Sequence, residues 1–314
     1  MTKIFFASDI HGSEVCFRKF VNAASFYGAD ILILGGDLTA KRVVPVVKYG
    51  SRYEASPFGR VETAESDADL AALENRIRAN GFYHYRCDED EFRRIQSSVQ
   101  EQKNLFQRLI LDSLRRWMQF AEERLGGGNV RCYVMLGNDD DPSVAGVLDE
   151  SNVVVNPERQ KVELPGGYEM VSVGYSNLTP FNSPREMSED ELRHLIAEQC
   201  ETLKTPEKAI FNLHCPPYNS GLDIAPELTS DLSVVMKGGQ PSMVPVGSKA
   251  IREAIEERQP LLGLHGHVHE ARGTAKIGRT VCVNPGSEYA VQVLRGAIVI
   301  LDKESIKGYQ FVSG

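Results

Sequence analysis

Short, mainly apolar runs recur along the chain, and each one ends in a cluster of polar residues. Five such runs cover residues 3–7, 31–34, 130–136, 209–213 and 261–264. Their length and weak alternation are typical of strands that are buried on both faces, as in a parallel sheet. Between the first two runs, residues 14–27 place apolar side chains at helical spacing. This order predicts a βαβ unit and an α/β fold class.

A different pattern fills residues 40–128. Ser66 followed by Asp69 resembles a capping box that opens a helix, and a longer helical pattern runs from about residue 88 to 125, where three glycines end it. We therefore expect one domain, residues 1–314, that carries residues 40–128 as a helical insertion packed over or beside the sheets. An independent small bundle is the alternative, since roughly 90 residues are enough for one.

The rest of the chain returns to short strands, turns and two helices. Ser188 followed by Glu191 predicts a capped helix that ends near residue 200, and residues 247–258 predict another. From residue 279 onward the pattern indicates strands, with Arg295 and the following glycine resembling a turn between two paired strands.

Composition narrows the classes of function. The 314 residues are 42% hydrophobic and 25% charged, with a formal net charge of −8. This acidic balance argues against duplex nucleic acid as a partner, because phosphate backbones are bound by basic patches. No apolar run reaches the ~18 residues of a membrane span, and the first run is too short for a signal peptide. The six cysteines are scattered, which predicts free thiols and a cytoplasmic protein.

Seven polar residues that follow the predicted strands are candidate metal ligands. They are Asp9, His11, Asp37, Asn138, His214, His267 and His269. We expect them to meet, because sites in α/β folds gather at the carboxyl ends of strands. Oxygen and imidazole donors without a thiolate suit Mn²⁺, Fe²⁺, Fe³⁺ or Zn²⁺. Seven donors are too many for one tetrahedral ion and suit two divalent ions that share a bridging carboxylate.

Three further residues could contribute to the site. His265 precedes His267 by two positions and could be a ligand, but we interpret it as a supporting hydrogen-bond donor. Asn177 and Arg185 lie on a predicted loop that could reach a substrate, although a plain turn explains them equally well.

These blocks resemble the calcineurin-like metallophosphoesterase superfamily. Its pattern D-x-H, G-D, G-N-x-D, H, G-H-x-H stands here as residues 9–11, 36–37, 137–140, 214 and 266–269, in order and across nearly the whole chain. The turn Asn284-Pro285-Gly286-Ser287 is also similar to one common in that superfamily. More loosely, residues 174–186 resemble the bacterial Icc-related branch, which lies near cyclic-nucleotide phosphodiesterases.

The resemblance implies a two-sheet, four-layer α/β sandwich and a dinuclear centre. One ion would be held by Asp9, His11 and His269, and the other by Asn138, His214 and His267, with Asp37 bridging the two. The implied reaction is hydrolysis of a small phosphate ester by metal-bound hydroxide, with phosphodiesters, cyclic nucleotides among them, ahead of monoesters. The alternative is an inactive or weakly active scaffold that uses the same fold for interaction; retention of all seven donors favours the enzyme.

Asp139 departs from the commonest pattern. Many members of the superfamily have a histidine at this position, which helps to bind phosphate or to protonate the leaving group. An ionised Asp139 would repel a phosphate, so we expect it to point away, to be protonated or to position water. We predict a catalytic role for Asp139, and the role of Asp140, the partner of that histidine elsewhere, stays open.

Overall fold

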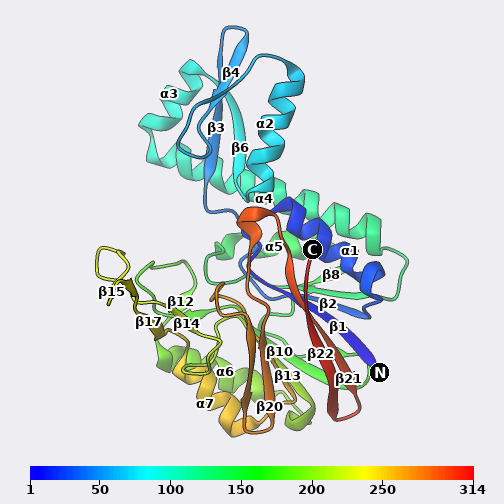
Figure 1. Cartoon of the computed structure of the whole chain (residues 1–314). Coiled ribbons are helices and arrows are strands. Elements are labelled where there is room, and N and C mark those ends of the chain that lie inside the picture. The colour runs from blue at the N-terminus through cyan, green and yellow to red at the C-terminus, as the bar shows by residue number, and fades with distance from the viewer.

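Two six-stranded sheets stack face to face in the computed structural model, which describes residues 1–314 (Figure 1). Across the first sheet the order is β22 (Ser305–Ser313), β21 (Arg295–Asp302), β1 (Thr2–Ala7), β2 (Ile31–Leu34), β7 (Arg131–Val134) and β8 (Val154–Val155). Across the second it is β19 (Gly273–Ile277), β20 (Thr280–Asn284), β18 (Leu262–Leu264), β13 (Ala209–Leu213), β10 (Tyr168–Val173) and β9 (Val162–Leu164).

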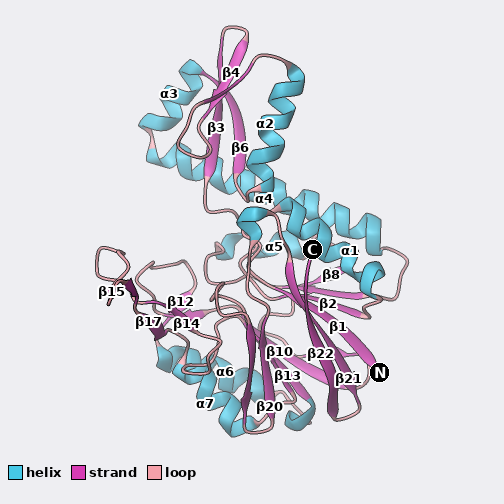
Figure 2. Ribbon diagram, viewed as in Figure 1, coloured by secondary structure: helices cyan, strands magenta, loops and turns pink.

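Alternation of side chains along the strands builds the layers. In β1, Ile4 and Phe6 enter the core between the two sheets, whereas Phe5 contributes to the core under the outer helices. Those helices are α1 (Glu14–Tyr27), α4 (Val99–Leu125) and α5 (Ala145–Leu148) on the first sheet, and α6 (Glu189–Glu201) and α7 (Lys249–Arg258) on the second. The predicted four-layer α/β sandwich is therefore confirmed (Figure 2).

The strands that precede the candidate site form parallel pairs, as predicted for the first βαβ unit. β1 pairs with β2, and β2 with β7, both in parallel; β13 pairs in parallel with β18 in the other sheet. Their carboxyl ends therefore lie along one edge of the sandwich. The predicted capping boxes at Ser66 and Ser188 are both present.

The insertion, predicted to be helical, contains a sheet as well as helices. A four-stranded sheet of β5 (Glu62–Ala64), β4 (Arg52–Ala55), β3 (Val43–Tyr49) and β6 (Tyr83–Asp88) carries α2 (Asp67–Ala79) and α3 (Glu89–Ser97). This part has a core of its own around Val44, Val46 and Ile77, and it projects away from the sandwich (Figure 1). The C-terminal half of α4 belongs instead to the sandwich, since Trp117 stacks on Phe17 of α1.

The final hairpin also differs from the sequence prediction. Arg295 and Gly296 begin β21, and the chain turns between Asp302 and Ser305. Gly296 is needed because a Cβ atom there would overlap the ring of Phe5, so this glycine reflects close packing and not a turn.

Smaller elements complete the fold. They are β11 (Ser176–Asn177), β12 (Glu186–Met187), β14 (Ile224–Pro226), β15 (Met236–Lys237), β16 (Gln240–Pro241) and β17 (Met243–Pro245), with 3-10 turns at Pro142–Val144, Pro206–Lys208 and Tyr289–Val291. All six cysteines are free, as predicted, and all of them are buried. None of the helices combines the length and apolar character needed to cross a bilayer.

Candidate metal centre

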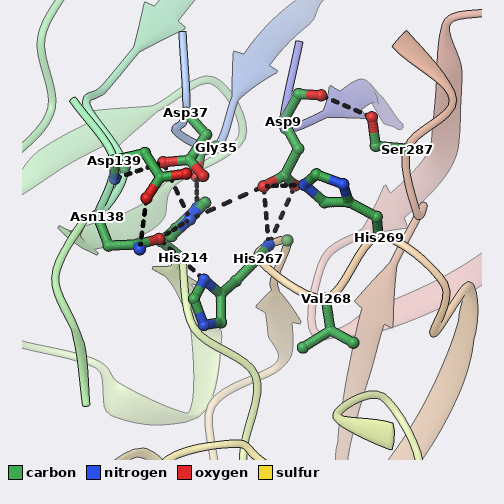
Figure 3. A network of polar contacts seen from close by, with 12 residues as sticks. Asp9, Gly35, Asp37, Asn138, Asp139, His214, His267, Val268, His269 and Ser287 are labelled. Carbon is green, nitrogen blue, oxygen red and sulfur yellow. Dashed lines mark hydrogen bonds and ion pairs between the residues drawn. The ribbon is translucent and has the colours of Figure 1, made fainter. Parts of the chain in front are cut away.

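The seven candidate ligands converge at the carboxyl ends of five strands. Figure 3 labels six of them, all except His11. Asp9 and His11 follow β1, Asp37 follows β2 and Asn138 follows β7. The second sheet adds one histidine after β13 and two after β18, namely His214, His267 and His269. The centre therefore lies where the ends of the two sheets meet, and residues 258 positions apart in the chain contact one another there.

One group of donors surrounds the point between His11 and His269. The Nε2 atoms of these histidines are 3.1 Å apart, and Nε2 of His269 lies 3.6 Å from Oδ1 of Asp9. Oδ2 of Asp37 approaches Nε2 of His11 to 3.5 Å. If these two nitrogens form a hydrogen bond, one of them carries the proton and only the other presents a lone pair. A cation between them could accept the lone pairs of both.

A second group of donors surrounds Asn138. Its Oδ1 atom lies 3.0 Å from Nε2 of His214 and 2.8 Å from Nδ1 of His267. The other carboxylate oxygen of Asp37, Oδ1, is 3.5 Å from Nε2 of His214. Asp37 thus presents one oxygen to each group. The clustered carboxylates and imidazoles could hold metal ions.

The charge states of these side chains follow from burial and from their neighbours. Burial alone would raise the pKa of Asp9, but His269 and His214 outweigh it and lower that pKa to about 2. The pKa of Asp37 is likewise well below its usual value, because His214 and His11 overcome the effect of burial. Burial lowers the pKa of His11 to about 4, which leaves its imidazole neutral and able to donate a lone pair.

Burial also lowers the pKa of His267 to about 4. Burial disfavours the charged form of His214 as well, but Asp37 and Asp9 outweigh it and raise the pKa of His214 to about 9, so this imidazole would have to release a proton to act as a ligand. The two carboxylates and the neutral imidazoles favour a cation.

Backbone geometry at the strand ends aims these side chains inward. Asp9, Asp37 and His267 have positive φ angles of 56°, 53° and 65°, an uncommon conformation for residues with a side chain. A Cβ atom at Gly137 would overlap the carboxylate of Asp37, and one at Gly266 would overlap that of Asp9. The glycines of the G-N and G-H blocks are therefore required by close approach.

Hydrogen bonds from a surrounding layer fix the orientation of the candidate ligands. Nδ1 of His214 donates to the carbonyl of Gly35 at 2.8 Å, which directs Nε2 toward the centre. The backbone N–H of His267 donates to both carboxylate oxygens of Asp9, at 3.0 and 3.1 Å. The hydroxyl of Ser287, in the Asn-Pro-Gly-Ser turn, donates to the carbonyl of Asp9 at 2.6 Å.

His265 is fully buried and lies outside the group of candidate ligands. Its Nδ1 atom donates to the carbonyl of Leu213 at 2.8 Å, at the end of β13 and next to His214. The interpretation of His265 as a supporting donor agrees with this contact. Asn177 is also structural, because its side chain donates to the carbonyl of Val246 at 3.3 Å.

Asp140 joins the two loops that carry Asp37 and Asn138. Its buried carboxylate accepts hydrogen bonds from the backbone N–H groups of Leu38, Thr39 and Gly137, at distances from 2.7 to 3.1 Å. Asp140, whose role the sequence left open, therefore positions the loops that carry Asp37 and Asn138.

Arg185 supports the same turn from the other side. Its Nη1 atom donates to the carbonyl of Gly137 at 3.0 Å, and its backbone N–H donates to the carbonyl of Asn138 at 3.0 Å. The guanidinium group also pairs with Glu158 and lies 4.3 Å from the ring centroid of Tyr175. Since only 3% of Arg185 is exposed, the expectation that it could reach a substrate is not supported.

Asp139 lies beside the centre, and three side chains neutralise or bind its carboxylate. The ammonium group of Lys41 forms an ion pair with Oδ2, and the hydroxyl of Ser183 donates to Oδ1. The side-chain amide of Asn138 donates to Oδ1 at 3.2 Å. The carboxylate remains within 4.8 Å of donor atoms of His11 and Asp37.

The sequence reasoning missed Lys41 and Ser183, and also Tyr289, whose ring centroid lies 4.7 Å from that of His11. Lys41 follows the Gly-Asp block by only four positions, and this proximity was the one available signal. No spacing rule would have indicated Tyr289, because its contact depends on the packing of the two sheets.

Comparisons with known proteins agree with the fold. No family model matches the chain. The chain is 34% identical over 170 residues to the uncharacterized protein MJ1162 of Methanocaldococcus jannaschii, an alignment that covers 53% of this chain and 69% of that protein. The crystal structure of TT1561 of Thermus thermophilus aligns over 100% of this chain and 98% of its own, with 14% identity and a TM-score of 0.55. Another crystal structure aligns over 97% of both chains, with 16% identity and a TM-score of 0.58.

Proposed function

This chain belongs to the family of protein MJ1162, and we propose that within that family it acts as a metal-dependent phosphoesterase, with phosphodiesters as its preferred substrates. The observation that carries the proposal is the position of Asp37, whose two carboxylate oxygens face two separate groups of nitrogen and oxygen donors. The order of the ligand blocks along the chain and the sandwich fold support the calcineurin-like metallophosphoesterase superfamily. The Icc-related branch remains a prediction.

Two divalent ions fit the donor set. We assign one to Asp9, His11 and His269, and the other to Asn138, His214 and His267, with Asp37 shared. The donor types suit Mn²⁺, Fe²⁺ or Zn²⁺. When bound, such ions lower the pKa of water and neutralise the charge on phosphate oxygens.

The residues around the ions have positioning roles. His214 is oriented by Gly35, and the Asp9 carboxylate by the backbone N–H of His267, so little rearrangement is needed when a substrate binds. Arg185 and Asp140 hold the turn that carries Asn138.

The electrostatics beside the centre support phosphodiesters over monoesters. Asp139 places a carboxylate where many metallophosphoesterases have a histidine, and Lys41 offsets its charge. A monoester dianion meets about twice the residual repulsion that a diester monoanion meets, since Coulomb energy is proportional to charge. We propose that Asp139 contributes through Lys41 and not by proton transfer.

The test is hydrolysis of bis(4-nitrophenyl) phosphate by the Mn²⁺-loaded protein and its variants. Asp37→Asn replaces one of the two shared carboxylate oxygens by an amide nitrogen and removes the negative charge. It is expected to abolish turnover and to leave the circular dichroism spectrum unchanged. Asp149→Asn changes an exposed carboxylate and is the control, with wild-type turnover expected. Full activity in Asp37→Asn, or no metal-dependent activity in the wild type on any phosphodiester, would refute the proposal.

A further inference from the structure

The feature that the proposed function leaves unexplained is Lys41. This residue lies on the short connection between Asp37 and β3, where the chain leaves the sandwich for the insertion. Tyr83, at the start of β6, fixes this connection from both sides: its hydroxyl accepts from the backbone N–H of Ala40 at 3.2 Å, and its backbone N–H donates to the carbonyl of Arg42 at 3.0 Å. The backbone of Lys41 is therefore held, whereas its side chain is 54% exposed.

The ammonium group of Lys41 has one polar partner, the carboxylate of Asp139. That carboxylate lies within 4.8 Å of donor atoms of His11 and Asp37, so the ammonium group sits at the rim of the candidate centre. In contrast, the nearby guanidinium of Arg185 is buried against Glu158 and Gly137 and cannot face a substrate.

Asp139 can release Lys41 without becoming an unpaired carboxylate. The hydroxyl of Ser183 and the side-chain amide of Asn138 both donate to its other oxygen, Oδ1, and would remain after the ammonium group moves. An exchange of partners by Lys41 therefore costs less than the removal of a sole partner would.

We propose that Lys41 is a substrate-binding residue of this centre, and that its ammonium group moves from Asp139 to a non-bridging oxygen of the phosphate ester. The inference rests on the proposed function, because it places the phosphate beside the same residues. Lys41 would then supply the positive charge that a histidine supplies in many metallophosphoesterases, and Asp139 would be the positioning residue that holds Lys41 ready when no substrate is bound.

The experiment measures the affinity of Mn²⁺-loaded protein for inorganic phosphate by titration calorimetry, with metal content checked by mass spectrometry. Lys41→Met is expected to weaken phosphate binding about tenfold to a hundredfold, the usual effect of losing a charge-assisted hydrogen bond, with the bound Mn²⁺ unchanged. Lys41→Arg keeps the charge and is expected to keep most of the affinity. Lys48→Met is the matched control, since Lys48 is exposed on β3 of the insertion, and it is expected to bind phosphate like the wild type.

Three results would overturn the inference: phosphate affinity in Lys41→Met equal to that of Lys48→Met, an equal loss in Lys41→Arg and Lys41→Met, or loss of Mn²⁺ from Lys41→Met. The first would remove any role in binding, the second would remove the role of charge, and the third would make Lys41 part of the metal site. Because phosphate binding needs no turnover, a Lys41-dependent affinity in a protein that hydrolyses no phosphodiester would support the inference while refuting the proposed function.

Discussion

Replacement of Arg185 by methionine tests how the fold holds the turn that carries Asn138. Arg185 is 3% exposed; it pairs with the carboxylate of Glu158 and donates to the carbonyl of Gly137 at 3.0 Å. Methionine fills part of the space but leaves Glu158 with one remaining donor, the backbone N–H of Gly174 at 3.1 Å. Loss of one partner of a buried ion pair costs about 3–5 kcal/mol of unfolding free energy. We expect that loss, together with weaker metal binding through Asn138.

The assay is urea unfolding of the chelator-treated protein, so that bound metal does not add to the stability of the folded state. Arg115→Met is the matched control: Arg115 pairs with Glu150 at 3.1 Å, but both side chains are about half exposed, and such pairs contribute about 0–1 kcal/mol. Glu158→Gln combined with Arg185→Met should recover part of the loss, because no buried charge is then unpaired. If Arg185→Met costs no more than Arg115→Met, the reasoning is wrong.

Other predictions concern the metal, a glycine and the pH dependence of stability. Removal of metal with a chelator is expected to lower the thermal unfolding midpoint, and Mn²⁺ should restore it; an unchanged midpoint would argue against a bound metal. Gly137→Ala is expected to reduce Mn²⁺ affinity at least about tenfold, because its Cβ would overlap Asp37, and calorimetry showing wild-type affinity would contradict this. Burial lowers the pKa of His265 to about 4 from an ordinary value of 6.5, so its neutral form stabilises the fold above pH 6.5, and this contribution is lost as the pH falls toward 4. Between pH 6.5 and 4, the unfolding free energy, measured with urea, should fall less steeply with pH in His265→Asn than in the wild type. The difference in slope is at most about 1.4 kcal/mol per pH unit, and equal slopes in the two proteins would refute the assignment.

The sandwich could be predicted because buried parallel strands leave strong signals in the sequence. Each of β1, β2 and β13 is a short, mainly apolar run, and residues 14–27 form a helix with the predicted limits. The same regularity brought the polar residues after the strands to one edge, where the structure places all seven candidate ligands close together.

The strands of the insertion could not be predicted in the same way. β4 and β5 are three or four residues long and half exposed, so they lack an apolar run, and the strong helical patterns of α2 and α4 dominate the region. The long helical pattern after residue 88 also belongs partly to the insertion and partly to the sandwich, because the C-terminal half of α4 packs on α1.

The residues that bind or position the candidate ligands depend on tertiary contacts. Asp140 and Arg185 act through hydrogen bonds to backbone groups. Every residue has such groups, so the sequence does not indicate which of them these side chains will contact. Lys41 meets Asp139 only because the connection to the insertion passes the centre. Spacing could suggest ligands, but it could not show which charged side chains face them.

Anomalous diffraction from crystals of the Mn²⁺-loaded protein tests the central claim most directly. We predict two anomalous peaks at the ends of β1, β2, β7, β13 and β18, one contacting His11 and the other His214, with the carboxylate of Asp37 touching both. A single peak, peaks elsewhere in the molecule, or no peak at all would contradict the assignment and would favour a protein that uses this fold without metal-dependent chemistry.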